Sequence, residues 1–201
     1  MGRDAGRAPL MNPDTLLLPG HAPDVSEAGR AAAVPLEPGA VFAEHGDYVW
    51  NTLRRLGVPL ADIEDLTHDT FVAVFRHWHA YDPERPLRPW LFGFALRVAS
   101  DHRRLARHRV EVSREPPDTP DEMPSAVEQL LRKEREALAQ AALQAVELSR
   151  RAVFILYELD GSTLPEIATA LAIPLGTASS RLRLAREDFA SAVKRLASRM
   201  R

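Results

Sequence analysis

Residues 163–186 read TLPEIATALAIPLGTASSRLRLAR and decide the fold of the C-terminal part of the chain. Thr163 stands three residues before Glu166, which is the spacing of a capping box at the start of a helix. The connection Ala172–Gly176 then leads directly into a second helix. Two short helices joined by so tight a turn predict a helix-turn-helix.

The polar face of the second helix suits the major groove of DNA. A recognition helix needs short or cationic side chains in its first turns, because these residues must approach the base edges. The chain provides Thr177, Ser179, Ser180, Arg181, Arg183 and Arg186. An ordinary helical hairpin with solvated arginines is the alternative that the pattern leaves open.

Helical periodicity extends to both sides of this motif. Residues 131–146 are rich in Ala, Leu and Glu, and Ser149 is expected to cap a short apolar helix over 149–159, with a turn at 160–161. In the helix after Gly176, the residues expected to face inward are Ala178, Leu182, Ala185, Phe189, Val193 and Leu196.

Three further helices are predicted at residues 41–56, 61–79 and 90–107, where apolar residues recur at spacings of three and four. Three prolines in residues 80–89 predict a constrained loop there. The residues expected to be buried are Phe42, His45, Val49, Leu53, Leu56, Ile63, Leu66, Thr70, Phe71, Val74, Phe75, Trp78, Leu91, Phe94, Ala95, Val98, His102 and Leu105. Since no β pattern occurs, the fold class is all-α, with two small helical domains.

Two proline-rich segments flank these domains. Residues 1–40 hold six of the 16 prolines and show no helical or strand period, so we expect a disordered extension. Residues 110–131 hold four more prolines and six acidic residues against one basic residue, which predicts a flexible acidic linker. The domains are therefore expected at residues 41–109 and 132–201.

Composition limits the compartment and the chemistry. The 201 residues include no cysteine, which excludes disulfides and thiolate zinc sites and fits a reducing compartment. No stretch approaches the roughly 18 apolar residues that a membrane span needs. We therefore expect a cytoplasmic protein without membrane insertion.

Several clusters outside the helix-turn-helix were weighed as sites. Arg97 and the basic residues of 102–109 form either a phosphate-binding stripe or a solvated helix end. Trp78 and Tyr81 either stack on unpaired bases or close a small core. Two histidines, His77 and His79, lie two residues apart and on a helix would project about 200° from each other, so no metal site is expected. No catalytic set stands out, and we expect neither an enzyme nor a cofactor.

Two motifs together resemble a known family, the bacterial RNA polymerase sigma factors. The motif that resembles their region two comprises DLTHDTF at 65–71, Trp90-Leu91, Ala95, Asp101 and Arg104. The motif that resembles their region four comprises EIA at 166–168, LGT at 175–177 and SRLRLAR at 180–186. Because a short linker joins these two regions with no domain between them, the resemblance is to the extracytoplasmic-function (ECF) group.

The resemblance implies a subunit that binds core RNA polymerase, recognises the −10 and −35 promoter elements and helps to open the duplex. It assigns polymerase binding to Asp65, His68, Asp69 and Val72. It assigns the −10 element to the loop at 80–89 with Trp78, Tyr81, Arg97, Ser100, Asp101 and Arg104. It assigns the −35 element to Thr177, Ser179, Ser180, Arg181, Arg183, Leu184 and Arg186. An anti-sigma factor is a further partner that the resemblance allows.

Five positions depart from the family pattern. His68 stands where Gln is usual and Arg97 where Asn is frequent, which predicts an altered −10 preference. Ser179 and Leu184 stand where a basic residue is common, which predicts a weaker or different −35 contact. Pro174 replaces a frequent helix-capping Ser.

Two other functions were weighed against this interpretation. One is a stand-alone helix-turn-helix regulator that binds duplex DNA through residues 132–201. The other is an all-α metal-dependent enzyme that uses His68, His77 and carboxylates.

Overall fold

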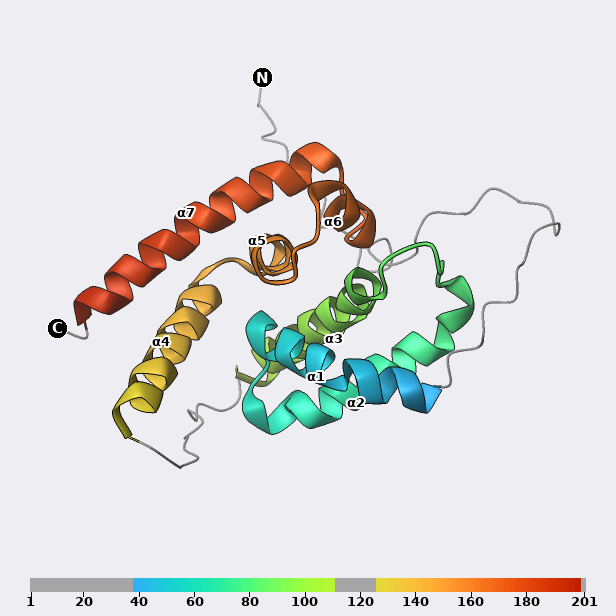
Figure 1. Ribbon diagram of the computed structural model, residues 1–201, viewed down its shortest axis with the longest axis horizontal. Helices are drawn as coiled ribbons and strands as arrows, with labels where there is room; N and C mark the ends of the chain where they lie inside the picture. The colour runs from blue at the N-terminus through green and yellow to red at the C-terminus, as the bar shows by residue number, and fades with distance from the viewer. Residues whose placement is uncertain (1–37, 111–125, 200–201) are drawn as a thin grey trace, which may run out of the picture.

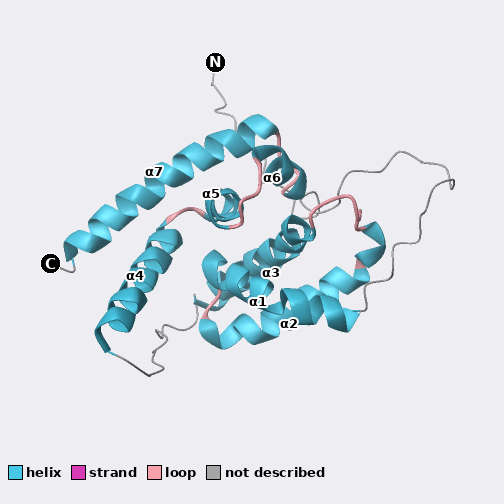
Figure 2. Cartoon of the chain, in the orientation of Figure 1, coloured by secondary structure: helices cyan, strands magenta, loops and turns pink. Residues whose placement is uncertain are grey.

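The computed structural model describes residues 38–110 and 126–199. All regular structure within these two ranges is helical, as the all-α prediction requires (Figure 2). The predicted extension up to residue 37 and the linker over 111–125 lie outside the described residues. None of the helices in the described part of the chain is both long enough and apolar enough to cross a bilayer.

The N-terminal half consists of three mutually packed helices (Figure 1): α1 (Pro38–Leu56), α2 (Leu60–Arg76) and α3 (Leu87–Val110), with a short 3-10 turn, η2 (Trp78–Ala80), after α2. Helix α1 begins three residues inside the predicted extension. Gly57, with a φ of 98°, ends α1, since a left-handed residue there costs glycine little.

Helix α3 begins at Leu87 and not at Trp90 as predicted. Pro89 falls in its first turn, where the missing N–H has no partner to lose. The burial predicted for α3 was wrong at Leu105, which is 56% exposed, whereas Phe92 is fully buried and was not predicted to be. In α1, Phe42 is 37% exposed, so it lies at the margin of the core and not within it.

The C-terminal half comprises α4 (Ala126–Ala145), α5 (Leu148–Phe154), the π-helical turn η3 (Ile155–Leu159), α6 (Leu164–Ala170) and α7 (Leu175–Arg199). The long helix α7 packs against α4, α5 and α6 (Figure 1). Helix α4 starts at Ala126, earlier than the predicted start at residue 131 and inside the predicted linker.

The cap of α5 is Glu147 and not Ser149 as predicted. The Glu147 carboxylate accepts hydrogen bonds from the backbone N–H groups of Ser149 at 3.0 Å and Arg150 at 3.2 Å. Burial alone would raise the pKa of Glu147, but the hydrogen bond from the Ser149 hydroxyl, together with those from the two N–H groups, outweighs burial and lowers it. The Ser149 hydroxyl itself donates to Glu147.

The two halves pack against each other, which the prediction of separate domains did not anticipate. Helix α1 contacts α4 and α5, and α3 contacts α6 (Figure 1). Buried residues from both halves, including Leu56 and Val58 from one and Val146 and Leu156 from the other, belong to one continuous hydrophobic core. The relative position of the halves is therefore set by apolar packing.

Candidate nucleic-acid interface

The outer face of α2 presents the four residues predicted to bind polymerase. Asp65, His68, Asp69 and Val72 recur at spacings of three and four, and all are exposed. The inner face is fixed by buried Ile63, Phe71 and Val74, and by Thr67 and Thr70, whose hydroxyls donate to the carbonyls four residues earlier. The result is an acidic helix face with an apolar residue, Val72, that is 47% exposed.

His68 is held in place by an aromatic neighbour from α1. Its ring stacks on Phe42 at a centroid distance of 5.7 Å, and Phe42 in turn meets Phe71 edge-on at 4.8 Å. The half-exposed Phe42 therefore extends the acidic α2 face with an apolar edge. The spacing of apolar residues predicts Phe42 in the core and gives no sign of this contact with His68.

The aromatic residues predicted to read the −10 element form a cluster. Trp78 lies 5.4 Å from Tyr81 and 5.7 Å from Trp90 between ring centroids. Trp90 is also 5.0 Å from Tyr81 and 4.8 Å from Phe94. Trp90 and Phe94 were not predicted as site residues, although their spacing of four on one helix face is a readable signal.

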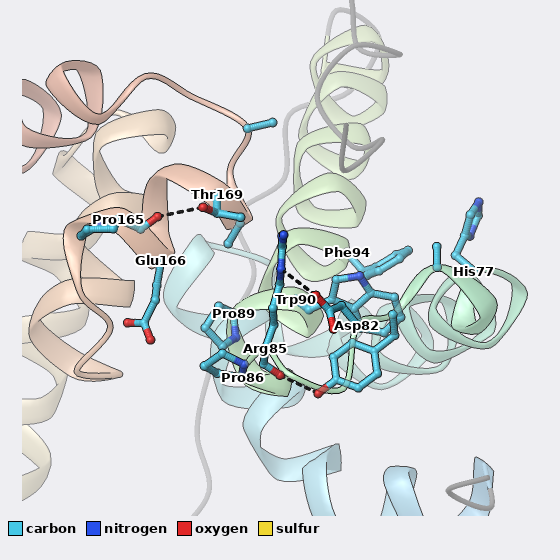
Figure 3. A pocket seen from close by; sticks show the side chains of 14 residues that line it. His77, Asp82, Arg85, Pro86, Pro89, Trp90, Phe94, Pro165, Glu166 and Thr169 are labelled. Atoms are coloured by element: carbon cyan, nitrogen blue, oxygen red, sulfur yellow. Dashed lines mark hydrogen bonds and ion pairs between the residues drawn. The ribbon is translucent and has the colours of Figure 1, made fainter. Parts of the chain in front are cut away.

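A cavity of about 370 Å³ opens beside this cluster (Figure 3). Tyr81, Trp90 and Phe94 line one side, and Pro165, Glu166 and Thr169 of α6 belong to its lining as well. The Tyr81 hydroxyl donates to the Arg85 carbonyl at 2.7 Å, and burial together with Asp82 raises the pKa of Tyr81. The loop that carries the aromatic cluster is thus braced by its own backbone.

The polar face of α3 is already engaged in local contacts. Arg104 pairs with Asp101 at 3.4 Å, and Arg97 is exposed. Ser100 is half-buried, and its hydroxyl donates to the Leu96 carbonyl of its own helix at 2.6 Å. Farther along α3, His102 pairs with Asp62 of α2 at 3.0 Å, which ties the start of the basic stripe to the scaffold.

The helix-turn-helix has the predicted construction. Thr163 and Glu166 form the capping box at the start of α6. The Glu166 carboxylate accepts a hydrogen bond from the Thr163 backbone N–H at 2.7 Å. In return, the Glu166 backbone N–H donates to the Thr163 hydroxyl oxygen at 3.5 Å. Pro174 provides only its carbonyl at the start of α7, which accepts from the N–H groups of Thr177 and Ala178. The second helix therefore begins without a side-chain cap, as the replacement of Ser by Pro implies.

The predicted −35 residues lie together on α7, but they differ in exposure and in partners. Ser179, Ser180 and Arg183 are exposed, whereas Thr177, Arg181 and Leu184 are half-buried. Arg183 pairs with Glu187 at 2.6 Å, one turn farther along the same helix.

Arg186 is bound to the scaffold and does not extend freely. Its guanidinium pairs with Glu158 at 2.6 Å and lies over the Tyr157 ring at 5.2 Å. The hydrogen bond that Arg186 donates to the Glu158 carboxylate raises the pKa of Arg186, so the guanidinium stays charged at any physiological pH. Glu158 and Arg186 are 28 positions apart, so no local sequence pattern identifies them as partners.

The argument against a metal site assumed that His77 and His79 lie on a helix, and the structure corrects this assumption. Helix α2 ends at Arg76, so the rings of His77 and His79 do not diverge as on a helix but stack at 6.5 Å. The Nδ1 atom of His77 is 2.8 Å from the Ala73 carbonyl. Within the described ranges, no group of three or more His, Cys, Asp or Glu side chains is placed to hold a metal ion.

Comparison with known proteins identifies the family. The family model for sigma-70 region 2 matches residues 41–109, and that for sigma-70 region 4 matches residues 136–189. The ECF RNA polymerase sigma factor SigL of Mycobacterium tuberculosis H37Rv is 34% identical over 165 residues, covering 79% of this chain and 89% of SigL. The sigma factor CnrH of Cupriavidus metallidurans is 28% identical over 167 residues, covering 76% of this chain and 84% of CnrH.

Solved structures share the fold. CnrH in complex with the cytosolic domain of CnrY aligns with a TM-score of 0.55 at 24% identity, over 78% of this chain and 87% of that one. The sigma factor RpoE in complex with the anti-sigma factor NepR from Bartonella quintana aligns with a TM-score of 0.58 at 19% identity, over 76% and 94%.

The fold and the two family-model matches therefore define a two-region RNA polymerase sigma factor. The chain belongs to the ECF group of this family, and it directs RNA polymerase to promoters. A stand-alone helix-turn-helix regulator is not supported, because the N-terminal half matches region 2 over its whole length.

Proposed function

We propose that this sigma factor divides promoter recognition among three surfaces. The acidic face of α2, comprising Asp65, His68, Asp69 and Val72, binds the core enzyme. The aromatic cluster and the α3 face, comprising Trp78, Tyr81, Arg97, Ser100, Asp101 and Arg104, contact the −10 element and hold it open. The exposed side of α7, comprising Thr177, Ser179, Ser180, Arg181, Arg183, Leu184 and Arg186, contacts the −35 element.

One observation supports this division above the others. The rings of Tyr81 and Trp90 line a cavity, Trp78 packs against both of them, and all three side chains are half-buried and not fully enclosed in the core. Exposed aromatic faces stack on unpaired bases with about 1–3 kcal/mol per base, largely independently of sequence. Such a cluster favours strand opening at the −10 element over recognition of closed duplex.

The experiment is transcription with purified core polymerase and this chain on a set of promoter fragments. We expect transcripts with uniform 5′ ends that require both components, and the replacement of Trp78 and Trp90 by Ala should abolish open-complex formation measured by permanganate reactivity of thymines. Duplex DNA binding by the chain with no effect on transcript start sites would contradict the proposal.

We also propose that this chain binds an anti-sigma factor and that it is located in the cytoplasm. RpoE of Bartonella quintana was solved with an anti-sigma factor, and its fold matches most of this chain. A sigma factor must also occupy the compartment that holds polymerase and chromosome. Co-purification of this chain from its own cells, followed by mass spectrometry, tests both points.

A further inference from the structure

The turn η3 places two side chains against the second helix of the helix-turn-helix, α7. Its backbone is a π turn, in which the Asp160 N–H donates to the Ile155 carbonyl at 3.1 Å, five residues earlier. Ile155 is fully buried and anchors the turn in the core. Tyr157 is half-buried, Glu158 is exposed, and both contact α7 through Arg186. Single π turns are frequent at functional sites of helices, which makes this contact a candidate for a functional role.

Glu158 binds one edge of the Arg186 guanidinium. Its Oε1 atom accepts a hydrogen bond from Nε at 2.7 Å and lies 2.6 Å from Nη2. The Tyr157 ring covers the face of the same group, with the guanidinium carbon 5.2 Å from the ring centroid. A guanidinium has five N–H donors, and neither contact with Glu158 involves the end that carries Nη1. Arg186 is therefore held at one edge and one face, while its far end is able to donate to a phosphate.

Arg186 lies on the same stripe of α7 as two residues predicted to contact the −35 element. Ser179 and Arg183 precede it by seven and three positions, and at 100° per residue the three directions fall within about 60° of one another. Leu182 and Ala185 are buried and fix this register. The Arg186 side chain is 52% exposed even though it is paired. The anchored guanidinium thus belongs to the surface proposed to contact the −35 element.

The ion pair of Arg183 on the same stripe has no comparable anchor. Its partner Glu187 stands one turn farther along α7, and the two side chains are 65% and 58% exposed. Pairs of this kind on a helix surface restrain their members little. Glu158 is only 33% exposed and belongs to a different element, so it fixes the direction of Arg186 relative to the core.

We propose that Glu158 is a positioning residue for the −35 contact, which together with Tyr157 holds the Arg186 guanidinium in the orientation that meets a DNA phosphate. The inference rests on the proposed −35 surface and adds a residue that does not belong to it. A side chain that is already positioned need not be ordered on binding, and ordering a mobile long side chain costs roughly two- to tenfold in affinity. Because every duplex presents phosphates, this contribution is the same for all base sequences.

The charge of Glu158 has an effect of the opposite sign, which makes the proposal testable. A carboxylate repels DNA, so the loss of its charge alone would tighten binding and steepen the salt dependence. Loss of positioning instead weakens binding and reduces the salt dependence, because a released Arg186 neutralises a phosphate less well. Exposed charges are screened beyond about 8 Å at physiological salt, so we expect the loss of positioning to dominate there.

The test measures how holoenzyme, assembled from core polymerase and this chain, binds a promoter fragment from the transcription experiment at three salt concentrations. Glu158→Ala should weaken binding roughly three- to tenfold, and it should lower the slope of log affinity against log salt by about 0.9, the value for one phosphate. Arg186→Ala should do the same. The double variant should bind no worse than Arg186→Ala, because the carboxylate acts only through the guanidinium.

Two conservative variants separate reach from charge. Glu158→Asp keeps the charge but shortens the side chain, so it should weaken binding like Glu158→Ala. Glu158→Gln keeps an oxygen acceptor at the same reach without the charge, so it should recover part of the loss. If Glu158→Ala loses helical circular dichroism, the Asp and Gln variants carry the test, since both retain a polar side chain at the contact.

The matched control is Glu187→Ala, which removes the same charge from the pair that has no anchor in the core. This variant should bind as tightly as wild type or more tightly. Equal changes for Glu187→Ala and Glu158→Ala, or tighter binding by Glu158→Ala, would overturn the proposal. Weaker binding by Arg186→Ala with wild-type binding by the Glu158 variants would overturn the positioning role alone. If Arg186→Ala binds like wild type, the −35 assignment of Arg186 is wrong, and its positioning by Glu158 is refuted with it.

Discussion

Arg151 is the most heavily bonded side chain of the described core. It is 1% exposed and donates to the carbonyls of Leu56, Gln144 and Val146 and to the Gln144 side chain. We expect Arg151→Met to lower the free energy of unfolding by about 3 kcal/mol or more, since buried carbonyls lose their donor while the stem is retained. Urea unfolding followed by circular dichroism measures the change.

The adjacent arginine is the control for this prediction. Arg150 pairs with Asp188 at 2.8 Å, but its side chain is 36% exposed. Arg150→Met should therefore cost at most about 1 kcal/mol, as surface ion pairs do. Equal losses for the two variants would show that Arg151 owes its burial to its apolar stem and not to its hydrogen bonds.

Arg183 and Arg186 should affect promoter binding differently. Arg183 is 65% exposed, and its ion pair with Glu187 lies on the surface of its own helix, so the guanidinium can exchange this partner for guanine O6 and N7. Arg183→Ala should cost about 1–3 kcal/mol at one base pair, with relaxed specificity there. Arg186 is tied to Glu158, so Arg186→Ala should weaken all sites alike and reduce the salt dependence. Holoenzyme binding to single-base promoter variants at two salt concentrations distinguishes the two, and a uniform loss for Arg183→Ala would make it a phosphate contact.

At the scale of single elements, α2 carries the prediction for polymerase binding. Its exposed face combines Asp65 and Asp69 with the apolar Val72, and a desolvated apolar centre with charges around it is typical of a docking surface. Asp65→Arg with Asp69→Arg should reduce core binding at least tenfold without loss of helix. Titration of labelled chain with core polymerase measures the affinity.

Glu44→Arg with Asp47→Arg on α1 gives the same change in net charge on another exposed helix. This control should bind core nearly as well as wild type. If both double variants lose affinity equally, the loss reports overall charge, and the assignment of the α2 face is wrong.

The turn of the helix-turn-helix holds a strained residue. Ala172 has a φ of 50°, a left-handed conformation that costs a residue with a side chain about 1–2 kcal/mol. Ala172→Gly should therefore raise stability by up to about 1 kcal/mol after the entropy of glycine is counted. Ala190→Gly, in the exposed interior of α7, should lower stability by about 1 kcal/mol, and thermal melts of both variants check the opposite signs.

At the scale of the whole molecule, the sequence predicts the parts better than their assembly. Spacing of apolar residues identifies the helices, and the Thr163–Glu166 spacing identifies the capping box, because both are local. The contact of Tyr48 with Asp160 spans 112 positions and that of Arg151 with Leu56 spans 95, and no local pattern encodes such pairs. Likewise Trp90 and Phe94 join the −10 cluster only because η2 folds back onto α3.

The continuous core predicts that the two halves unfold together. Trp50, Trp78 and Trp90 all lie in the N-terminal half, so intrinsic tryptophan fluorescence reports that half alone. A fluorophore on Ala190→Cys reports the C-terminal half. We expect the two probes to give the same urea midpoint, because Leu56 and Val58 are buried against residues of the other half and one half cannot unfold without exposing the core of its neighbour.

The contact of Tyr48 and Arg55 with Asp160 should control this cooperativity. Tyr48→Phe with Asp160→Ala removes the Asp160 carboxylate that holds Tyr48 and Arg55 across the halves. The halves then remain connected by apolar contact and by the hydrogen bonds of Arg151 and Gln140 to the end of α1. The tryptophan and fluorophore midpoints should then separate, with a lower apparent slope of free energy against urea for each probe, since each half exposes less surface on its own. Separate midpoints already in the wild-type chain would mean that the shared core is too weak to couple the halves.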